Sequence, residues 1–224
     1  RWREARMVLD SLRTIDAEKA MGIEAWSVVL GLAPPSFGPL LDSAVKAVPP
    51  GPESDYGSAM LRMLKGEVAE GRRQFARTLA RGDSRLTSQI RGLVVAGDGL
   101  GLILQGDSVA GIRRMREGLD LAAAPDIGEE SAYLRLQFAL ALAARPETRV
   151  EGMRWLRYGF ETLPLYKPLT FLALGHAYEA AGRRDSAAVA YSRFLRLWDK
   201  ADPELPGRVG EAKAALQEVS KEPF

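Results

Sequence analysis

His176 is the only histidine of the 224-residue chain, so it is the first candidate for acid–base chemistry or for contact with a ligand. The chain has no cysteine and no second histidine, which argues against a zinc site. No nucleophile elbow accompanies His176, so a Ser-His-Asp triad has no support either. We therefore favour an ordinary groove or surface position for this residue.

Two further patterns resemble parts of cofactor or catalytic sites. The stretch 97–101, GDGLG, has the glycines of a phosphate-binding loop, but a dinucleotide fingerprint needs a preceding strand, and here both flanks have helical patterns. We expect these glycines to allow close helix packing. The acidic pairs Glu67/Glu70 and Glu129-Glu130 could hydrolyse glycosides only across a cleft of defined width. Glu129-Glu130 precedes an apolar helix, where acidic residues favour the positive helix end. We predict a non-catalytic chain that needs no cofactor or metal.

Arginines recur along one face of several predicted helices, beginning with Arg73, Arg77 and Arg81 at spacings of four. The others are Arg113, Arg114, Arg116, Arg154, Arg157, Arg193 and Arg196. Such rows could follow a phosphate backbone. The net charge is only +2, however, and acidic residues are mixed with the basic ones. We expect a solvated face with nearby carboxylates, which argues against nucleic acid as the partner.

Composition favours helices throughout. Apolar residues make up 46% of the chain, Ala, Leu, Arg and Glu are abundant, and no stretch shows the alternation of a strand. No run reaches the roughly 18 uninterrupted apolar residues of a membrane span. The absence of cysteine fits the cytoplasm, which is the default expectation, and a periplasm equally well, so the compartment stays open. We therefore predict an all-α fold.

From about residue 51 onward the sequence repeats itself. Four segments begin at Gly66, Gly106, Glu147 and Gly182, which are 40, 41 and 35 residues apart. Such a period is typical of stacked helix pairs. We expect the first residue of each segment, usually Gly, to end one helix at positive φ. The segment itself should form the second helix of a pair.

Each segment also repeats a pattern of small and large residues. A small residue stands five positions after the start and should let the two helices approach closely. Large apolar residues follow four and eight positions later and should fill the space between neighbouring pairs. The small positions are Gly71, Gly111, Gly152 and Ala187, and the large ones are Phe75, Leu79, Met115, Leu119, Leu156, Phe160, Tyr191 and Leu195.

Residues 171–191 resemble a tetratricopeptide repeat (TPR), with Gly182 in the tight turn. The matching residues are Phe171, Leu174-Gly175, Tyr178, Ala187 and Tyr191. Phe194 and Asp199 depart from the pattern, where a small residue and a proline are usual. The resemblance implies a TPR-like α-solenoid, a right-handed superhelix of antiparallel helix pairs. The segment that starts at Asp202 should then form a solvated capping helix.

The resemblance also sets the expected domain limits and context. Residues 51–224 should form the repeat array and residues 1–50 an irregular helical cap or a preceding repeat, together one continuous domain. The C-terminal segment from Tyr191 is similar to the last repeats of bacterial regulators, in which a TPR array follows a serine/threonine kinase or a winged-helix domain. No kinase motif occurs here, so that similarity implies the array alone.

Stacked helix pairs leave an extended concave surface, which first-helix side chains should line. The residues expected on it are Leu169, Leu172, His176, Glu179, Leu93, Ala96, Leu100 and Ile103. The apolar second half of this set could instead be buried under the N-terminal helices, which would close the groove. Aromatic residues between 155 and 171 should be core, with one or two left exposed as anchors for a partner.

The sequence thus predicts a protein–protein interaction scaffold that binds a partner peptide or helix, in an oligomeric state that stays open. An alternative is a sensory domain of a bacterial kinase or transcription regulator with a small molecule inside the superhelix. A buried polar pocket around His176 would favour that alternative. Nucleic-acid binding through the arginine rows is a third possibility, and binding that hardly changes with salt would exclude it.

Overall fold

The computed structural model of the chain describes residues 7–8, 10–12, 14–15, 50–122, 129–160, 166–198 and 207–221. In this part of the chain every regular element is an α helix and no strand occurs, which confirms the all-α prediction. The predicted N-terminal cap falls almost entirely outside the described residues. The side chains of Glu129 and Glu130 lie outside them as well.

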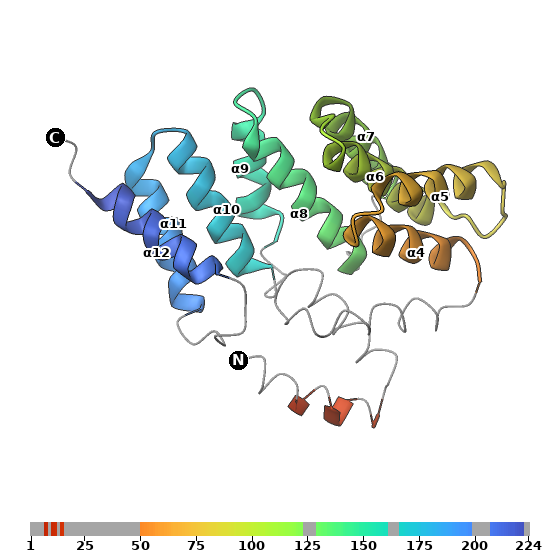
Figure 1. Ribbon diagram of the computed structural model, residues 1–224, viewed down its shortest axis with the longest axis horizontal. Helices are drawn as coiled ribbons and strands as arrows, with labels where there is room; N and C mark the ends of the chain where they lie inside the picture. Colours follow the sequence, from red (N-terminus) through yellow and green to blue (C-terminus); the bar gives the residue numbers. More distant parts are fainter. Residues whose placement is uncertain are drawn as a thin grey trace. The chain divides into compact units, whose positions relative to one another are not determined.

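Helices that follow one another in the sequence pack against one another (Figure 1). The helices are α4 (Pro52–Leu64), α5 (Val68–Ala80), α6 (Ser88–Leu104), α7 (Ser108–Leu121), α8 (Glu129–Ala144), α9 (Arg149–Tyr158), α10 (Lys167–Ala180), α11 (Arg184–Leu197) and α12 (Arg208–Ser220).

The chain divides into two compact units within α8, between Phe138 and Ala139. In the N-terminal unit, α4 packs on α5, α5 on α6 and α6 on α7, and α4 also contacts α6. In the C-terminal unit, α9 packs on α10, α10 on α11 and α11 on α12. Each unit is thus built from helix pairs that pack in sequence order. A single solenoid running through both units stays a prediction.

Three of the predicted glycine turns have the expected geometry. Gly66, Gly106 and Gly182 have φ values of 89°, 94° and 70°, a region that L side chains rarely adopt. In each turn two backbone N–H groups donate back to the preceding helix. At the end of α6, the N–H of Asp107 donates to the Leu102 carbonyl at 3.0 Å, and the N–H of Gly106 donates to the Ile103 carbonyl at 2.9 Å. This is the Schellman arrangement, which satisfies the last carbonyls of α4, α6 and α10.

The connection from α8 to α9 differs from the other three because it has no glycine. The Thr148 hydroxyl donates to the Leu142 carbonyl at 2.8 Å, and the Arg149 guanidinium donates to the Ala143 carbonyl at 3.3 Å. Side chains therefore satisfy the end of α8 where a positive-φ glycine does so elsewhere. Glu147, the predicted helix-ending residue, lies in the middle of this connection.

The small residues of the second helices lie against the first helices, as predicted. A Cβ atom on Gly71 would lie 2.7 Å from the Ala59 carbonyl oxygen, and one on Gly111 would lie 2.7 Å from the Gly99 carbonyl oxygen. Ala187 is fully buried. Because real Cβ atoms are not found at such distances, these positions admit no larger residue without moving a helix.

The α6–α7 pair has the most glycines at its interface. Gly92 faces Gly118, and a Cβ on either would lie within 2.6 Å of the other's carbonyl oxygen. Gly99 and Gly111 form a second reciprocal pair, at 2.8 Å and 2.7 Å. The GDGLG stretch is therefore helical and serves packing, as the sequence predicted. No phosphate-binding loop exists at this position.

The large apolar residues of the repeat pattern form much of the described core. Phe75, Met115 and Tyr191 are fully buried, and Leu156 is 2% exposed. Four residues further on, Leu119 and Phe160 are buried as well. Leu79 and Leu195, at the same position, are only half-buried.

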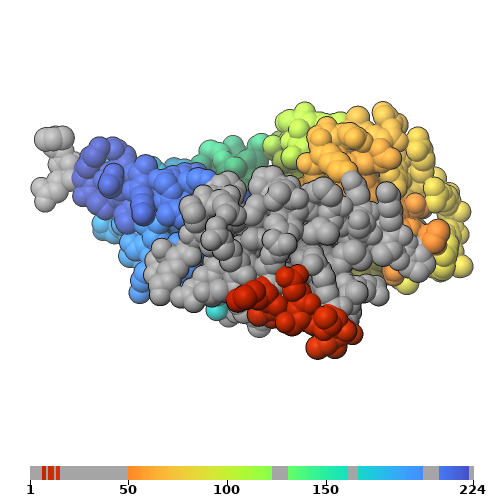
Figure 2. Space-filling view, turned by 60° about the horizontal axis from the view of Figure 1, so that its bottom comes forward, coloured from red at the N-terminus to blue at the C-terminus, as the bar shows by residue number. Residues whose placement is uncertain are grey.

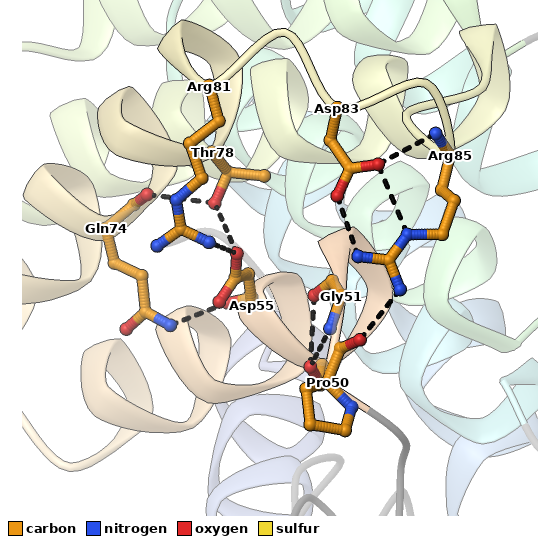
Figure 3. A network of polar contacts seen from close by, with 9 residues as sticks. Pro50, Gly51, Asp55, Gln74, Thr78, Arg81, Asp83 and Arg85 are labelled. Carbon is orange, nitrogen blue, oxygen red and sulfur yellow. Dashed lines mark hydrogen bonds and ion pairs between the residues drawn. The ribbon is translucent and has the colours of Figure 1, made fainter.

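Polar contacts fix the start of α4 to the end of α5 and to the loop that follows (Figure 3). The Arg81 guanidinium lies 2.6 Å from Asp55 Oδ2, and Gln74 Nε2 donates to the Asp55 carbonyl at 3.1 Å. The Arg85 guanidinium donates to the Pro50 carbonyl at 2.9 Å and pairs with Asp83 at 2.8 Å. Asp55 and Asp83 thus each pair with an arginine, and their contacts join α4, α5 and the loop after α5.

A second polar contact joins three helices of the N-terminal unit. Asp98, in the centre of α6, pairs with Arg72 of α5 at 2.8 Å and with Arg114 of α7 at 3.4 Å. The Asp98 side chain is only 19% exposed. Because the three groups are largely shielded from solvent, removal of the carboxylate alone should cost more stability than removal of one partner of a surface ion pair.

An arginine at or near the start of α9 and of α11 contacts the C-terminal end of the next helix. Arg149 donates to the Ala180 carbonyl of α10 at 3.1 Å. Arg184, at the equivalent repeat position, donates to the carbonyls of Glu218, Val219 and Lys221 at the end of α12. The segment α12 therefore takes the place that a further first helix would have. Figure 2 shows it, in the darkest blue, at the surface of the C-terminal unit.

Candidate functional site

The first half of the predicted surface lies on α10 and divides into buried and exposed residues. Leu169 and Leu172 are buried, with 9% and 8% exposure. His176 and Glu179 are exposed. The two leucines are therefore shielded from solvent, and their predicted contact with a partner stays a prediction. The helical register identified one face of α10, but only the last turns of that face reach solvent.

The second half of the predicted surface is in the core of the N-terminal unit. Leu93, Ala96 and Leu100 are buried and Ile103 is half-buried. Gly118 of α7 lies directly against the Ala96 backbone nitrogen, so this part of α6 faces α7. The suggestion that N-terminal helices cover this set concerns residues outside the described part of the chain.

His176 belongs to a small polar cluster on α10, α11 and α12. Its Nδ1 lies 3.0 Å from the Tyr191 hydroxyl, which donates to Glu179 at 2.6 Å. Its Nε2 lies 3.2 Å from Glu211 of α12. Both ring nitrogens thus have neighbours, and the histidine links α12 to α10. Burial, and then the hydrogen bond to Glu179, raises the pKa of Tyr191 above its ordinary value, so the phenol stays neutral.

The described contacts of His176 do not include a side chain that it could activate as a nucleophile. A neutral phenol that already donates to Glu179 is not a nucleophile, and no serine or threonine lies within the set of His176 contacts that the described residues make. The His176 side chain is 44% exposed, so it does not line a buried polar pocket. The described residues include no group of three acidic or histidine side chains that could hold a metal ion.

A groove lies between α9 and α11, with α10 as its floor. We call it the α9–α11 groove; its volume is about 550 Å³, within the ordinary range for ligand sites. Leu156, Phe160, Phe171, Leu174 and Tyr178 contribute apolar surface. Lys167, Thr170 and Ser186 add polar groups, and Asp185 the one carboxylate. All its residues belong to the C-terminal unit.

Two hydrophobic residues at this groove are exposed. Tyr158 of α9 is 63% exposed, and Val189 of α11 is 54% exposed. Of the aromatic residues between 155 and 171, Phe160 and Tyr166 are buried, so Tyr158 fits the expectation that one or two would be left as anchors. An exposed aromatic and an exposed valine on opposite walls provide apolar contacts for a partner.

Cationic side chains surround the same groove and rest on its aromatic rings. The Arg157 guanidinium lies 5.6 Å from the Tyr178 ring centre and donates to the Tyr178 hydroxyl. Arg193 lies 5.7 Å from the Phe171 ring centre. Arg183, just beyond the lining, lies 5.0 Å from Tyr178. No carboxylate among the described residues forms an ion pair with these arginines. Such cation–π contacts hold a guanidinium in place while leaving its N–H edge available.

The arginine rows are not alike in the two units. Arg73 and Arg77 pair with Glu70, at 2.6 Å and 3.5 Å, and Arg81 pairs with Asp55. The arginines in and just after α5 therefore have nearby carboxylates, as the sequence predicted for a solvated face. Arg157 and Arg193 instead border the α9–α11 groove. Sequence reasoning placed these two in the rows but did not relate them to a groove.

Val189, Lys167 and Tyr178 were not among the predicted site residues. A usable signal did exist, because Val189 and Arg193 are four residues apart on the predicted second helix and occupy none of its predicted core positions. No described helix is long and apolar enough to cross a membrane. No known protein family, curated protein or solved structure matches the chain.

Proposed function

We propose that the chain is a non-catalytic, TPR-like helical repeat domain that binds a segment of a partner protein. Support for the repeat interpretation comes from features that recur at equivalent positions. These are the Schellman glycines, the small residues against the first helices, and the Arg149 and Arg184 contacts to the following helix. Contacts between consecutive pairs are what a stacked array requires.

The observation that carries the binding proposal is the α9–α11 groove. It is open, has an apolar floor, and leaves Tyr158 and Val189 exposed on its two walls. Exposed apolar residues that border one groove are typical of an interaction site. The proposed binding surface therefore differs from the predicted one, since second helices form its walls and Leu169 and Leu172 do not take part.

The small-molecule sensor remains the alternative from another class. A buried polar pocket around His176 would have supported this alternative. Instead, His176 is half-exposed and is linked to Glu211. No specific observation on the described residues supports it over a peptide-binding scaffold. The two proposals differ in the result of the following experiment.

A peptide-library selection on the immobilised chain tests the proposal. We expect enriched peptides with a shared motif, which would bind the free chain in a fluorescence anisotropy titration. Val189→Asp should weaken this binding at least about tenfold, because a charge would stand on an apolar wall. Val109→Asp is the matched control, since Val109 is 64% exposed on α7 and does not line the groove. A selection without a motif, or equal loss with both variants, would contradict the proposal.

A further inference from the structure

The α9–α11 groove has an excess of positive charge that the rest of the chain does not share. Lys167, Arg157 and Arg193 line it, against the single carboxylate of Asp185. The whole chain carries a net charge of only +2. Arg73 and Arg77 pair with Glu70, and Arg81 pairs with Asp55, whereas the arginines of the groove contact aromatic rings. The groove is thus a local positive site with an apolar floor.

The guanidinium groups are held in positions suited to an anion. Arg157 is fixed by both the ring and the hydroxyl of Tyr178, and Arg193 is fixed over Phe171. A stacked guanidinium loses little further conformational freedom on binding. Its N–H edge can therefore donate two parallel hydrogen bonds to a carboxylate. Lys167 supplies a third cation at the start of α10.

We propose that the groove selects an acidic segment of the partner, one in which Asp or Glu residues flank an apolar side chain. This inference rests on the proposed function and specifies its partner. The carboxylates would bind Arg157, Arg193 and Lys167, while the apolar side chain would contact Tyr158 and Val189. The Asp185 carboxylate would accept a hydrogen bond from a backbone N–H of the partner, a group that a peptide offers and a phosphate backbone does not.

Nucleic acid fits this groove less well than a peptide does. Leu156, Phe160 and Leu174 give it apolar surface, which offers no partner to a phosphate. Nonspecific nucleic-acid binding depends on many phosphate contacts along a continuous basic surface. Three cations around an apolar hollow instead match alternating acidic and apolar side chains.

Defined probes test the charge selection. The first is a short fluorescein-labelled peptide with Leu or Phe at every third or fourth position and Glu elsewhere, and the second has Gln in place of each Glu. We expect the acidic peptide to bind at least about tenfold tighter, and more weakly as salt is raised. Oligothymidylate and phosphatidylglycerol vesicles are measured in parallel.

Variants with the same change in charge assign the effect to the groove. Arg193→Gln and Lys167→Gln should each weaken binding of the acidic peptide several-fold to about tenfold. Arg196→Gln is the control, because Arg196 is exposed on α11, the helix that carries Arg193, and does not line the groove. Both test residues are exposed, so the variants should fold, which their thermal melts verify.

The outcomes separate this inference from the proposed function. Equal affinity for the Glu and Gln peptides, or unchanged affinity in both groove variants, would overturn the charge selection. So would tighter binding of the oligonucleotide or the vesicles through Arg193 and Lys167. If the library motif is neutral or basic and still depends on Val189, the scaffold proposal stands and the acidic partner is refuted. If no peptide binds, both are refuted.

Discussion

The effect of Gly152→Ala on stability follows from how closely α9 approaches α8. A Cβ on Gly152 would lie 2.7 Å from the Ala143 Cα and 2.9 Å from the Ala139 carbonyl oxygen. The nearest atom is the Ala143 nitrogen at 2.3 Å, and ordinary contact begins at 3.4 Å, so the helices would have to separate by about 1.1 Å. All of these neighbours are backbone atoms, which cannot rotate away as a flexible side chain can.

The magnitude is the difference between two opposing effects. Overpacking of this kind costs about 1–3 kcal/mol. Ala stabilises a helix by about 0.5–1 kcal/mol relative to Gly, so the net loss should be about 1–2 kcal/mol. Gly210→Ala is the matched control, because Gly210 lies within α12 of the same unit and has open space around it. There the substitution should stabilise by about 0.5–1 kcal/mol.

Urea unfolding followed by circular dichroism measures both variants against the parent chain. The two substitutions are chemically identical, so opposite signs can arise only from the surroundings of each glycine. If Gly152→Ala stabilises the protein as much as Gly210→Ala does, close helix approach is not the reason for the small residues. Gly111→Ala, facing the Gly99 carbonyl oxygen at 2.7 Å, repeats the test in the N-terminal unit.

Three further predictions address the polar contacts. Asp98→Asn should lower stability by about 1–3 kcal/mol, because two partly buried arginines lose their shared carboxylate. Glu70→Gln should leave the melting temperature nearly unchanged, because its arginine partners Arg73 and Arg77 are 60% and 61% exposed. Equal effects of the two substitutions would contradict this. Arg184→Ala should speed hydrogen exchange of α12 amides, since three carbonyls at its end lose their donor; unchanged exchange would show that apolar packing alone holds α12. Burial raises the pKa of Tyr133 to about 12, so its neutral form is favoured on folding. The contribution of neutral Tyr133 to the free energy of unfolding should be fully present below pH 10, the ordinary pKa of tyrosine. It should fall by about 1–3 kcal/mol as the pH approaches 12. Tyr133→Phe should flatten this decline, and a parallel decline in parent and variant would exclude the tyrosine as its cause.

Local features of the fold could be predicted from the sequence because their cause is local. Positive φ at Gly66, Gly106 and Gly182 follows from a glycine that ends one helical pattern and precedes another. The small residues at 71, 111 and 152 follow from their constant spacing to those turns. Each inference needs only the repeat and the conformational freedom of glycine.

The binding surface could not be predicted in the same way, because it depends on distances between helices. The register of α10 places Leu169, Leu172 and His176 on one face, but the burial of the two leucines depends on how closely neighbouring helices pack. The α9–α11 groove exists because α9 and α11 stay apart over α10, which no residue spacing encodes. Asp98 illustrates the same limit, since its two arginine partners come from different helices.

The location of the partner in the groove can be measured directly, because the chain has no cysteine and a single introduced one can be labelled uniquely. A nitroxide attached to Val189→Cys should lose mobility as the library-selected peptide is added, with the same dissociation constant as the anisotropy titration. The same label on Val109→Cys should stay mobile. Immobilisation at position 109, or no change at position 189 when the peptide is bound, would show that the partner binds elsewhere.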